Sequence, residues 1–356
     1  MSTINPGITI NDKVFSQKTK GLIVAEGACN HLCVMDNAYK MIDEVAKAKA
    51  DAIKFQTYSA DKLTSKSAKA YGNISTKSQY EYYRQFDRFG RAEYDDLFEY
   101  SKEKGIIAFS TPFDPENAQM LNSVHMPIFK IASCDIQYLD LLKEVACFQK
   151  PIILSTGGST LEEINNSLEI LDKYGAGEVA LLACTLSYPT EIDDANYRKI
   201  INLIKEFPNN LIGISDHVEP EKNMISGAIC ASLGAKIFEK HFTLDNKMGG
   251  GSSYSMNPNE LKGYVRNIRL SERLLGESEQ KVYDAEKETR NSSRRSLVAN
   301  CDIKVGSIIS REIIGVKRPG TGIPPKEMDK VVGLKVIKKI FQDQQLAWEN
   351  FKNSDE

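Results

Sequence analysis

Charged, hydroxyl and imidazole side chains recur at one kind of position in this 356-residue chain, at or shortly after the carboxyl ends of short apolar runs. If these runs are parallel strands, their carboxyl ends meet at one mouth, so we expect these side chains to lie close together. One polar residue in such a place is as readily structural as functional, whereas the repetition along the chain indicates a site. The residues concerned are Glu26, Lys54, Gln56, Thr111, Lys130, Ser133, Asp135, Ser155, Tyr188, Ser215, His217, Glu239 and His241.

Two lysines in this set point to an anionic ligand. Lys54 and Lys130 would project toward one mouth, and two desolvated ammonium groups side by side repel unless an anion lies between them. Backbone N–H groups of residues 155–158, just before a helix predicted to start at Thr160, would suit a phosphate. A ligand that carries a carboxylate and a phosphate would satisfy this set. Further hydroxyl donors for it are Thr111, Ser133, Ser155 and Ser215.

Two of the four histidines follow neighbouring predicted strands. His217 and His241 suit a divalent transition-type metal such as Mn²⁺, with positions left for water and a substrate oxygen. A structural pair, or a general base with a helper, are the alternatives. His31 either contacts substrate or fixes the loop after the first strand, and His125 precedes a strand at the opposite end and is interpreted as structural.

Eight runs of continuous apolar residues predict the strands that position these groups. Unbroken apolar character, rather than alternation, is typical of parallel strands buried on both faces. Amphipathic helical patterns separate the runs, and eight strand–helix units over about 250 residues predict a closed (β/α)8 TIM barrel. A doubly wound open sheet is the rival, but no glycine-rich dinucleotide motif follows the first run. The predicted strands are residues 21–25, 51–55, 106–109, 127–131, 151–154, 179–183, 211–214 and 235–238.

Two segments interrupt this regular pattern. Residues 58–90 form a long polar insertion with aromatic residues near its end, which either covers the mouth as a lid or packs onto the barrel. Residues 278–293 are charged and serine-rich and are predicted to be a linker. Beyond them, residues 294–356 hold short strand-like pieces separated by glycine and proline, which indicate a small, mostly β domain. The predicted barrel domain is therefore residues 1–277.

The overall composition argues against several function classes. A net charge of −2 disfavours nucleic acid as a partner, because binding to a phosphate backbone requires a basic surface. No apolar run is long enough to span a bilayer, and the first residues lack the apolar core of a signal peptide, so no membrane partner and a cytoplasmic location are expected. The seven cysteines are scattered and odd in number, which is typical of buried thiols rather than of disulfides or zinc ligands.

The chain resembles the sialic acid synthase family, the synthases of N-acetylneuraminate, legionaminate and pseudaminate, over almost its whole length. The motifs that carry the likeness are IVAEGACNH, ADAIKFQTY, FSTPFD, FKIASCD, ILSTGG, ACTLSYPT, GISDH, GAKIFEKHFTLD and SMNP. The segment with DIKVGSII and KRPGTGIPP resembles the family's antifreeze-like (SAF) domain. The resemblance implies a TIM barrel that condenses phosphoenolpyruvate with an N-acylated hexosamine and releases phosphate. It also implies a domain-swapped homodimer, in which the small domain closes the active site of the partner.

The same resemblance implies roles for individual residues. His217 and His241 would bind the metal, usually Mn²⁺ with Mg²⁺ or Co²⁺ as alternatives, and either Glu26 or Glu239 would handle the proton of an attacking water. Arg318 would reach the N-acyl group of a sugar bound in the partner subunit. The residues implied for phosphoenolpyruvate are Lys54, Thr111, Lys130, Ser133, Ser155 and Ser215, and those for the sugar are Gln56, Asp135, Tyr188 and Arg318.

Three departures from the family pattern leave the reaction class intact but leave the sugar open. Cys33 replaces the usual glycine of an N-H-x-G motif, Leu186 replaces a varied polar residue, and no carboxylate lies near Gly251, where relatives use an aspartate to contact sugar hydroxyls. An N-acetylmannosamine and a 2,4-diacetamido-dideoxyhexose both fit. The alternatives are a synthase that uses a phosphorylated sugar, whose relatives lack the SAF-type domain, and a non-catalytic sugar-binding relative.

Overall fold

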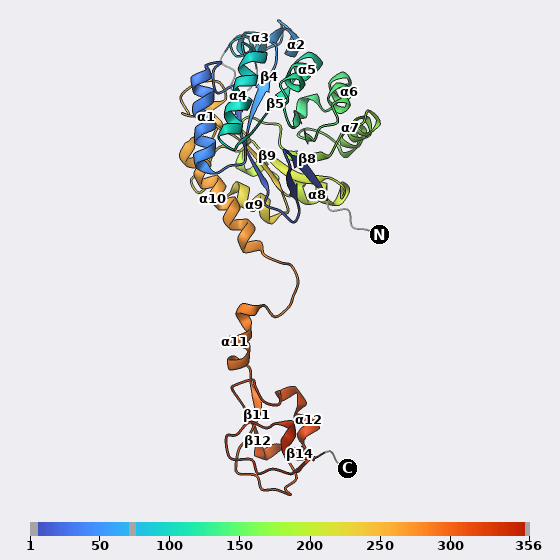
Figure 1. Cartoon of the computed structure of the whole chain (residues 1–356), viewed down its shortest axis with the longest axis vertical. Helices are drawn as coiled ribbons and strands as arrows, with labels where there is room; N and C mark the ends of the chain where they lie inside the picture. The colour runs from blue at the N-terminus through green and yellow to red at the C-terminus, as the bar shows by residue number, and fades with distance from the viewer. Residues whose placement is uncertain (1–5, 71–75, 353–356) are drawn as a thin grey trace. The chain divides into compact units, whose positions relative to one another are not determined.

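The computed structural model describes residues 6–70 and 76–352 of the chain. The chain divides into two compact units, Met1–Gly276 and Glu277–Glu356, each with its own hydrophobic core (Figure 1). The first unit contains every residue predicted to form the site except Arg318, which belongs to the second.

Eight parallel strands of the first unit close into a barrel in which β10 is hydrogen-bonded to β3 (Figure 1). The predicted (β/α)8 fold is confirmed, and the open sheet is excluded. Every predicted apolar run overlaps one of these strands, and several strands continue past the run to include a site residue. The strands are β3 (Leu22–Ala28), β4 (Ala52–Thr57), β5 (Ile107–Pro112), β6 (Phe129–Ile131), β7 (Ile152–Ser155), β8 (Val179–Cys184), β9 (Leu211–Asp216) and β10 (Ile237–His241).

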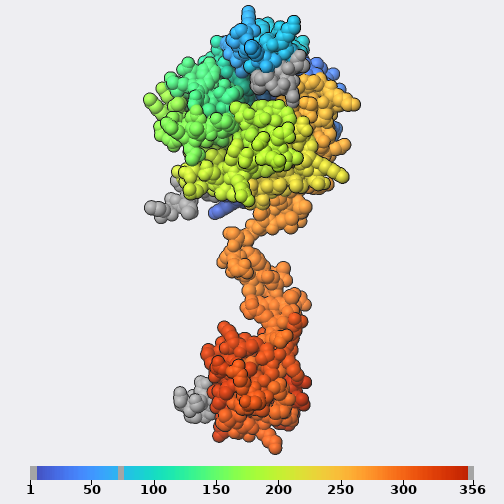
Figure 2. Space-filling view, turned by 180° about the vertical axis from the view of Figure 1, so that it is seen from behind, coloured from blue at the N-terminus to red at the C-terminus, as the bar shows by residue number. Residues whose placement is uncertain are grey.

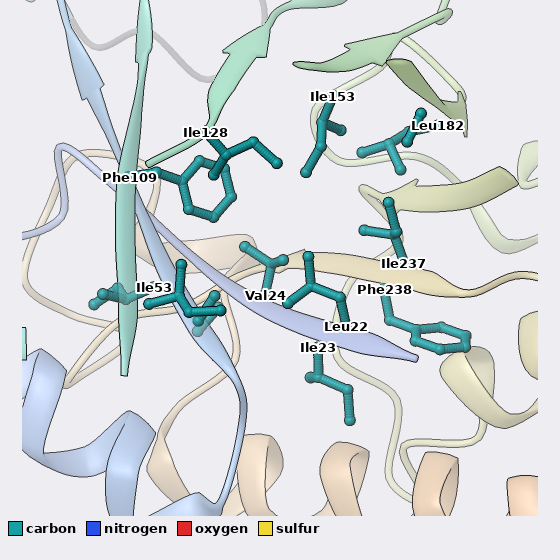
Figure 3. Close-up of a cluster of buried hydrophobic side chains, with 14 of the residues drawn as sticks. Leu22, Ile23, Val24, Ile53, Phe109, Ile128, Ile153, Leu182, Ile237 and Phe238 are labelled. Carbon is teal, nitrogen blue, oxygen red and sulfur yellow. The ribbon is translucent and has the colours of Figure 1, made fainter. Parts of the chain in front are cut away.

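Burial on both faces explains why unbroken apolar runs form these strands. Every residue of β3, β5, β6, β7, β9 and β10 is buried. Figure 3 shows side chains from several strands, among them Val24, Phe109 and Ile153, gathered in one cluster. Each of these three lies two positions before a predicted site residue, so it shares that residue's face of the strand. The apolar cluster therefore packs directly below the predicted site residues, on the same faces of the strands.

Helices follow the strands along the chain and cover the outside of the barrel (Figure 1). Figure 2 shows the surface of this unit from behind, with its green and yellow segments facing the viewer. Local sequence sets where the helices begin: α7 is capped by Thr160, whose backbone N–H and side chain pair with Glu163 in a capping box, as predicted. The helices are α1 (Met35–Ala48), α4 (Arg91–Glu103), α5 (Pro115–Ser123), α6 (Leu139–Cys147), α7 (Leu161–Lys173), α8 (Lys199–Glu206), α9 (Ser226–Ser232) and α10 (Pro258–Leu275).

A β-hairpin that sequence reasoning did not predict precedes the barrel. Strands β1 (Gly7–Ile10) and β2 (Lys13–Ser16) are joined by Asn11 and Asp12, both in the left-handed conformation that these residue types tolerate. Its apolar side chains belong to the barrel core, and the backbone N–H of Thr9 donates to Glu178, directly before β8. The hairpin therefore closes the amino end of the barrel, opposite the predicted site.

The insertion after β4 contains two short helices, α2 (Ala60–Leu63) and α3 (Gln79–Tyr83), while residues 71–75 lie outside the described part. Its aromatic side chains pack inward. Tyr83 meets Tyr58 edge-on, and Phe89 stacks on His31 with ring centroids 4.5 Å apart. In the described residues these aromatics therefore have a packing role.

The second unit is small and mostly irregular, with two antiparallel strand pairs around its own core. The segment expected to be a linker includes a helix, α11 (Asp284–Ser293), because Glu286 accepts from the backbone N–H of Tyr283 and caps its first turn. None of this helix's residues is buried. The remaining elements are β11 (Ser296–Ala299), β12 (Ile314–Lys317), α12 (Met328–Val331), β13 (Lys335–Val336) and β14 (Phe351–Lys352).

Candidate active site

The carboxyl ends of the barrel strands surround one cavity, and twelve residues predicted for the site line it. Phe113, Ala132 and Cys184 also line it and were not predicted, although each lies within one of the motifs quoted above. The full lining is Glu26, Lys54, Gln56, Thr111, Phe113, Lys130, Ala132, Ser133, Ser155, Cys184, Tyr188, Ser215, His217, Glu239 and His241.

The two predicted lysines have counter-ions inside the protein. Lys54 forms an ion pair with Glu26 and lies 3.0 Å from the Thr111 hydroxyl. Lys130 donates to the Ser155 hydroxyl at 2.6 Å. The expectation that the lysines require an external anion is therefore incomplete, because a carboxylate on a neighbouring strand already offsets part of their charge.

Glu239 lies between the lysines. Its Oε1 is 3.9 Å from Lys54 Nζ, 3.8 Å from Lys130 Nζ, and accepts from the Ser215 hydroxyl at 2.9 Å. Its other oxygen, Oε2, is buried and has no hydrogen-bond partner among the described residues. The second oxygen is thus available to a ligand.

The two glutamates respond differently to the same burial. For Glu26, desolvation outweighs the attraction of Lys54 and raises its pKa to about 7. For Glu239, desolvation alone would raise the pKa, but the two lysines and the Ser215 hydroxyl outweigh it and the pKa falls. Glu239 is therefore the stable anion near neutral pH, while Glu26 can hold or release a proton.

The two imidazoles of the cavity are neighbours, with ring centroids 5.5 Å apart. Burial lowers the pKa of His217 to about 4 and the pKa of His241 well below its ordinary value, so both rings are neutral. His217 Nδ1 lies 2.9 Å from the carbonyl oxygen of Thr185, which leaves Nε2 toward the cavity. His241 Nδ1 is buried and has no hydrogen-bond partner among the described residues.

These features fit a metal site with few protein ligands. A neutral imidazole offers a lone pair to a divalent ion, and an orphaned buried nitrogen is what such a site would leave in the protein alone. Within residues 6–70 and 76–352, no group of three or more histidine, cysteine, aspartate and glutamate side chains is placed to hold a metal ion. A metal on His217 and His241 would thus keep most of its coordination positions for water and substrate.

Aromatic rings stand beside the imidazoles. Tyr188 lies 4.1 Å from His217 between ring centroids, and Tyr254 lies 5.2 Å from His241. Tyr254 comes from the segment GGGSSYS, which lacks a carboxylate. A Cβ added at Gly251 would be 2.6 Å from the Tyr254 hydroxyl, so the phenol occupies the space next to this glycine. Sequence reasoning missed Tyr254 because no apolar run precedes it.

The backbone cradle expected for a phosphate at residues 155–158 is largely occupied. The N–H of Thr156 donates to the Leu182 carbonyl and that of Gly157 to the Ser133 hydroxyl. A side chain at Gly157 would also collide with Cys184, so glycine is required for close approach here. Because Glu163 caps the helix that follows, its N-terminus is closed to an anion, and side chains carry the binding of any phosphate.

The remaining predicted residues lie outside this cavity lining. Asp135 sits just beyond Ser133 in a short 3-10 turn, and burial raises its pKa to about 6. Arg318 is exposed in the second unit. His31 fixes its own loop, because its Nδ1 accepts from the backbone N–H of Cys33, and His125 is exposed in the turn before β6. All seven cysteines are free, as expected, but Cys134, Cys147 and Cys301 are exposed and Cys33 is half-buried, so the expectation that most are buried thiols is wrong.

A closed (β/α)8 barrel with lysines and histidines at its mouth, followed by a small β unit, defines the class of protein, and comparison with known proteins defines the family. The NeuB family matches residues 41–280, and the SAF domain matches residues 294–352. The chain is 36% identical to an uncharacterised protein of Methanocaldococcus jannaschii over 96% of this chain and 98% of that protein. It is 35% identical to the N,N'-diacetyllegionaminic acid synthase of Campylobacter jejuni over 93% of this chain and 99% of that enzyme.

A solved structure agrees with this result. The N-acetylneuraminic acid synthetase of Leptospira borgpetersenii superposes with a TM-score of 0.72 at 32% identity, covering 81% of this chain and 96% of that one. The protein therefore belongs to the NeuB family of nonulosonic acid synthases. Among the described residues, no helix has the length and apolar character needed to cross a bilayer.

Proposed function

We propose that this protein condenses phosphoenolpyruvate with the open-chain form of an N-acylated hexosamine to give a nine-carbon sugar acid and phosphate. The observation that carries the proposal is the cavity itself, where two buried lysines and two neutral histidines face one space. The relatives named as legionaminic and N-acetylneuraminic acid synthases support the same reaction class.

In this proposal, the lysines bind the anionic substrate. Lys54 and Lys130 attract the phosphate and carboxylate of phosphoenolpyruvate, and nearby hydroxyls donate to its oxygens. The hydroxyl donors are Thr111, Ser133, Ser155 and Ser215.

His217 and His241 would hold a divalent ion, Mn²⁺ in the first instance and Mg²⁺ or Co²⁺ as alternatives. When bound, the ion would act as a Lewis acid toward the sugar aldehyde. The protein's own contribution is to orient the aldehyde carbon against C3 of phosphoenolpyruvate, which removes much of the entropic barrier to a two-substrate reaction. Neutral rings are essential for this role, since an imidazolium offers no lone pair.

The reaction requires one new carbon–carbon bond and the loss of phosphate. C3 of phosphoenolpyruvate bonds to the aldehyde carbon, whose C=O pi bond breaks and whose oxygen takes a proton to become a hydroxyl. Water adds to C2, and the C2–O bond to phosphate breaks, which leaves a ketone at C2 and releases phosphate. The water must lose a proton as it adds. We assign that proton to Glu26, since a base works best when its pKa is near the working pH, whereas Glu239 is held as an anion by both lysines.

The acceptor sugar would lie on the histidine side, near Gln56 and Tyr188, with Asp135 close to its entry. Tyr254 joins this group, because its ring stands beside His241. Arg318 of the partner subunit would complete the pocket in a domain-swapped homodimer. Tyr188 in the cavity lining, Tyr254 beside His241 and the lack of a carboxylate in residues 249–255 favour a sugar with N-acyl groups and few hydroxyls, such as a 2,4-diacetamido-dideoxyhexose.

The decisive experiment is a panel of hexoses incubated with phosphoenolpyruvate and the purified protein. The panel contains N-acetylmannosamine, 2,4-diacetamido-dideoxyhexoses and phosphorylated hexosamines, each with Mn²⁺ and with chelator. Phosphate release and the mass of the product acid are measured. A phosphorylated acceptor as the best substrate would favour the alternative synthase, and no phosphate release with any sugar would favour a non-catalytic relative.

The domain-swapped arrangement has its own test by complementation. We call Arg318 the arm residue, because it would reach into the partner's site. An Arg318→Ala variant lacks this residue, and a His217→Ala variant lacks one of the two histidines of its own barrel. If the arm residue acts in the partner, dissociating and reassociating an equal mixture restores about a quarter of wild-type turnover, because half of the dimers are mixed and each has one intact site. An arm residue that acts within its own subunit gives no recovery.

A further inference from the structure

A buried ion pair is formed by the two residues that precede His217 and His241 in the sequence, and it takes no part in the reaction proposed above. Lys240 Nζ is 2.8 Å from Asp216 Oδ2, and the two side chains are 2% and 1% exposed. The residues are register partners on β9 and β10. Each immediately precedes one of the histidines in the sequence, Asp216 before His217 and Lys240 before His241.

The pair also holds the backbone that follows His217. Asp216 Oδ1 accepts from the N–H of Val218 at 3.0 Å, and the Lys240 ammonium donates to the carbonyl of the same residue. Tyr197 donates its hydroxyl to Asp216 Oδ1 at 3.0 Å. Both polar groups of the Val218 backbone are thus fixed by one ion pair, just where the chain leaves the strand.

Strand geometry separates the roles of neighbouring residues. Side chains alternate between the two faces, so Ser215, His217, Glu239 and His241 line the cavity while Asp216 and Lys240 point away from it. A buried ion pair is weak evidence for stability, because the cost of removing two charges from water offsets most of their attraction. What distinguishes this pair from apolar residues is therefore its directional hold on the Val218 backbone after β9, together with its link from β9 to β10.

We propose that Asp216 and Lys240 are positioning residues that fix the direction and spacing of the His217 and His241 rings. Only the metal part of this inference rests on the proposed function. Outer partners of metal-binding histidines usually hold the ring by a hydrogen bond to its second nitrogen. Asp216 and Lys240 instead act through the backbone that carries the rings, because their bonds go to each other and to Val218. Their loss therefore loosens the ring pair without touching the lysines on the opposite side of the cavity.

The test uses the small number of histidines. With only four histidines in the chain, selective ¹³C labelling of the imidazole Cε1 position gives one NMR signal each for His31, His125, His217 and His241. The main variant is the double substitution Asp216→Asn/Lys240→Met, which leaves no buried charge unpaired. We expect the His217 and His241 signals to shift or broaden while those of His31 and His125 stay in place.

The second part of the test measures Mn²⁺ binding by the same proteins. Mn²⁺ affinity, measured by titration calorimetry, should fall about 10-fold in the double variant, which is the lower end of the loss seen when a partner bonded directly to a ligand histidine is removed. Phosphoenolpyruvate affinity should stay within about 3-fold. Lys240→Arg, which keeps the charge, should recover most of the Mn²⁺ affinity.

A matched control breaks an ion pair at the other end of the barrel. Arg269 Nη2 lies 2.5 Å from Asp51 Oδ2, outside the cavity lining. The variant Arg269→Met/Asp51→Asn should lower the melting temperature yet leave the His217 and His241 signals unchanged.

Unchanged His217 and His241 signals in a folded Asp216→Asn/Lys240→Met protein would overturn the inference, as would an equal loss of Mn²⁺ and phosphoenolpyruvate affinity. A wild-type protein that binds no Mn²⁺ would refute the metal site of the proposed function instead. The NMR comparison would still decide the positioning role in that case.

Discussion

The two sides of the cavity are equally buried but differ in charge. We call Lys54 and Lys130 with their hydroxyl partners the lysine half, and His217 and His241 with their tyrosines the histidine half. In the lysine half, Glu26 and Glu239 lie within ion-pair distance of the ammonium groups and stabilise charge. In the histidine half, no carboxylate of the described residues forms an ion pair with either ring, and burial keeps both rings neutral.

In the function proposed above, this difference would let one cavity hold an anion beside a cation. Charged lysines without counter-ions would repel an entering metal ion, and protonated histidines would repel it as well. Glu239 is placed at the boundary, since it contacts both lysines and shares β10 with His241. The comparison therefore predicts that the two halves can be disabled separately.

The largest effect is expected from the histidine half. His217→Ala should lower turnover about 1000-fold, because Lewis-acid assistance amounts to several kcal/mol of transition-state stabilisation. Phosphoenolpyruvate affinity, measured by titration calorimetry, should be retained, and circular dichroism should report an intact fold. His125→Ala, at the opposite end of the barrel, is the control. Near-normal turnover of the wild type after chelation would contradict the metal role.

A smaller loss of turnover is expected when Glu26 is replaced. Its size distinguishes a general base from a residue that only neutralises Lys54. Glu26→Gln should lower kcat about 100-fold, in the range that loss of general base catalysis produces, with little change in phosphoenolpyruvate affinity. Steady-state kinetics with saturating substrates measure this. If Glu26 only neutralises Lys54, the variant should instead bind phosphoenolpyruvate more tightly and keep its kcat. Glu272→Gln, a partly buried glutamate paired with Arg269, is the matched control.

The lysine half should show the opposite kinetic pattern. Lys130→Met should lower kcat/KM for phosphoenolpyruvate about 30-fold, since a hydrogen bond to a charged group contributes roughly 2 kcal/mol. Mn²⁺ affinity should be unchanged. Lys150→Met removes another partly buried lysine, which donates to the Met126 carbonyl outside the cavity, and should leave both values unchanged. A Lys130→Met protein that loses Mn²⁺ binding would show that the halves are not independent.

The barrel and most of its mouth could be predicted because one physical rule governs both. Buried parallel strands require unbroken apolar runs, and a polar residue that ends such a run must face the mouth or be satisfied elsewhere. Lys54, Lys130, His217 and His241 were all found in this way, and the cavity contains all four.

The parts that could not be predicted depend on contacts between distant segments. The pairing of Glu26 with Lys54 depends on the register between strands, which the local sequence does not encode. Tyr254 reaches His241 from a glycine-rich segment with no periodic pattern. The amino-terminal hairpin has strands of four residues each, too short for a reliable alternation. The arm residue Arg318 lies in a separate unit.

His31 is buried outside the cavity, so its neutral ring affects the stability of the fold rather than the chemistry of the site. The pKa of His31 is lowered by burial to about 4, while an unfolded chain has the ordinary value of 6.5. Between these values the unfolded state binds more protons, so the free energy of unfolding decreases as pH falls from 6.5 toward 4. Going from pH 7 to pH 5 should remove about 2 kcal/mol through His31 alone.

The variant His31→Asn should lose this part of the acid sensitivity, because asparagine keeps an acceptor for the Cys33 N–H but does not titrate. Urea titrations at pH 7 and pH 5, followed by far-UV circular dichroism, measure the difference. His217 and His241 contribute in the same direction in both proteins, so the comparison of variant with wild type isolates His31. His125→Asn should show the wild-type pH response, and an equal response in His31→Asn would mean that the folded protein protonates His31 at its ordinary pKa.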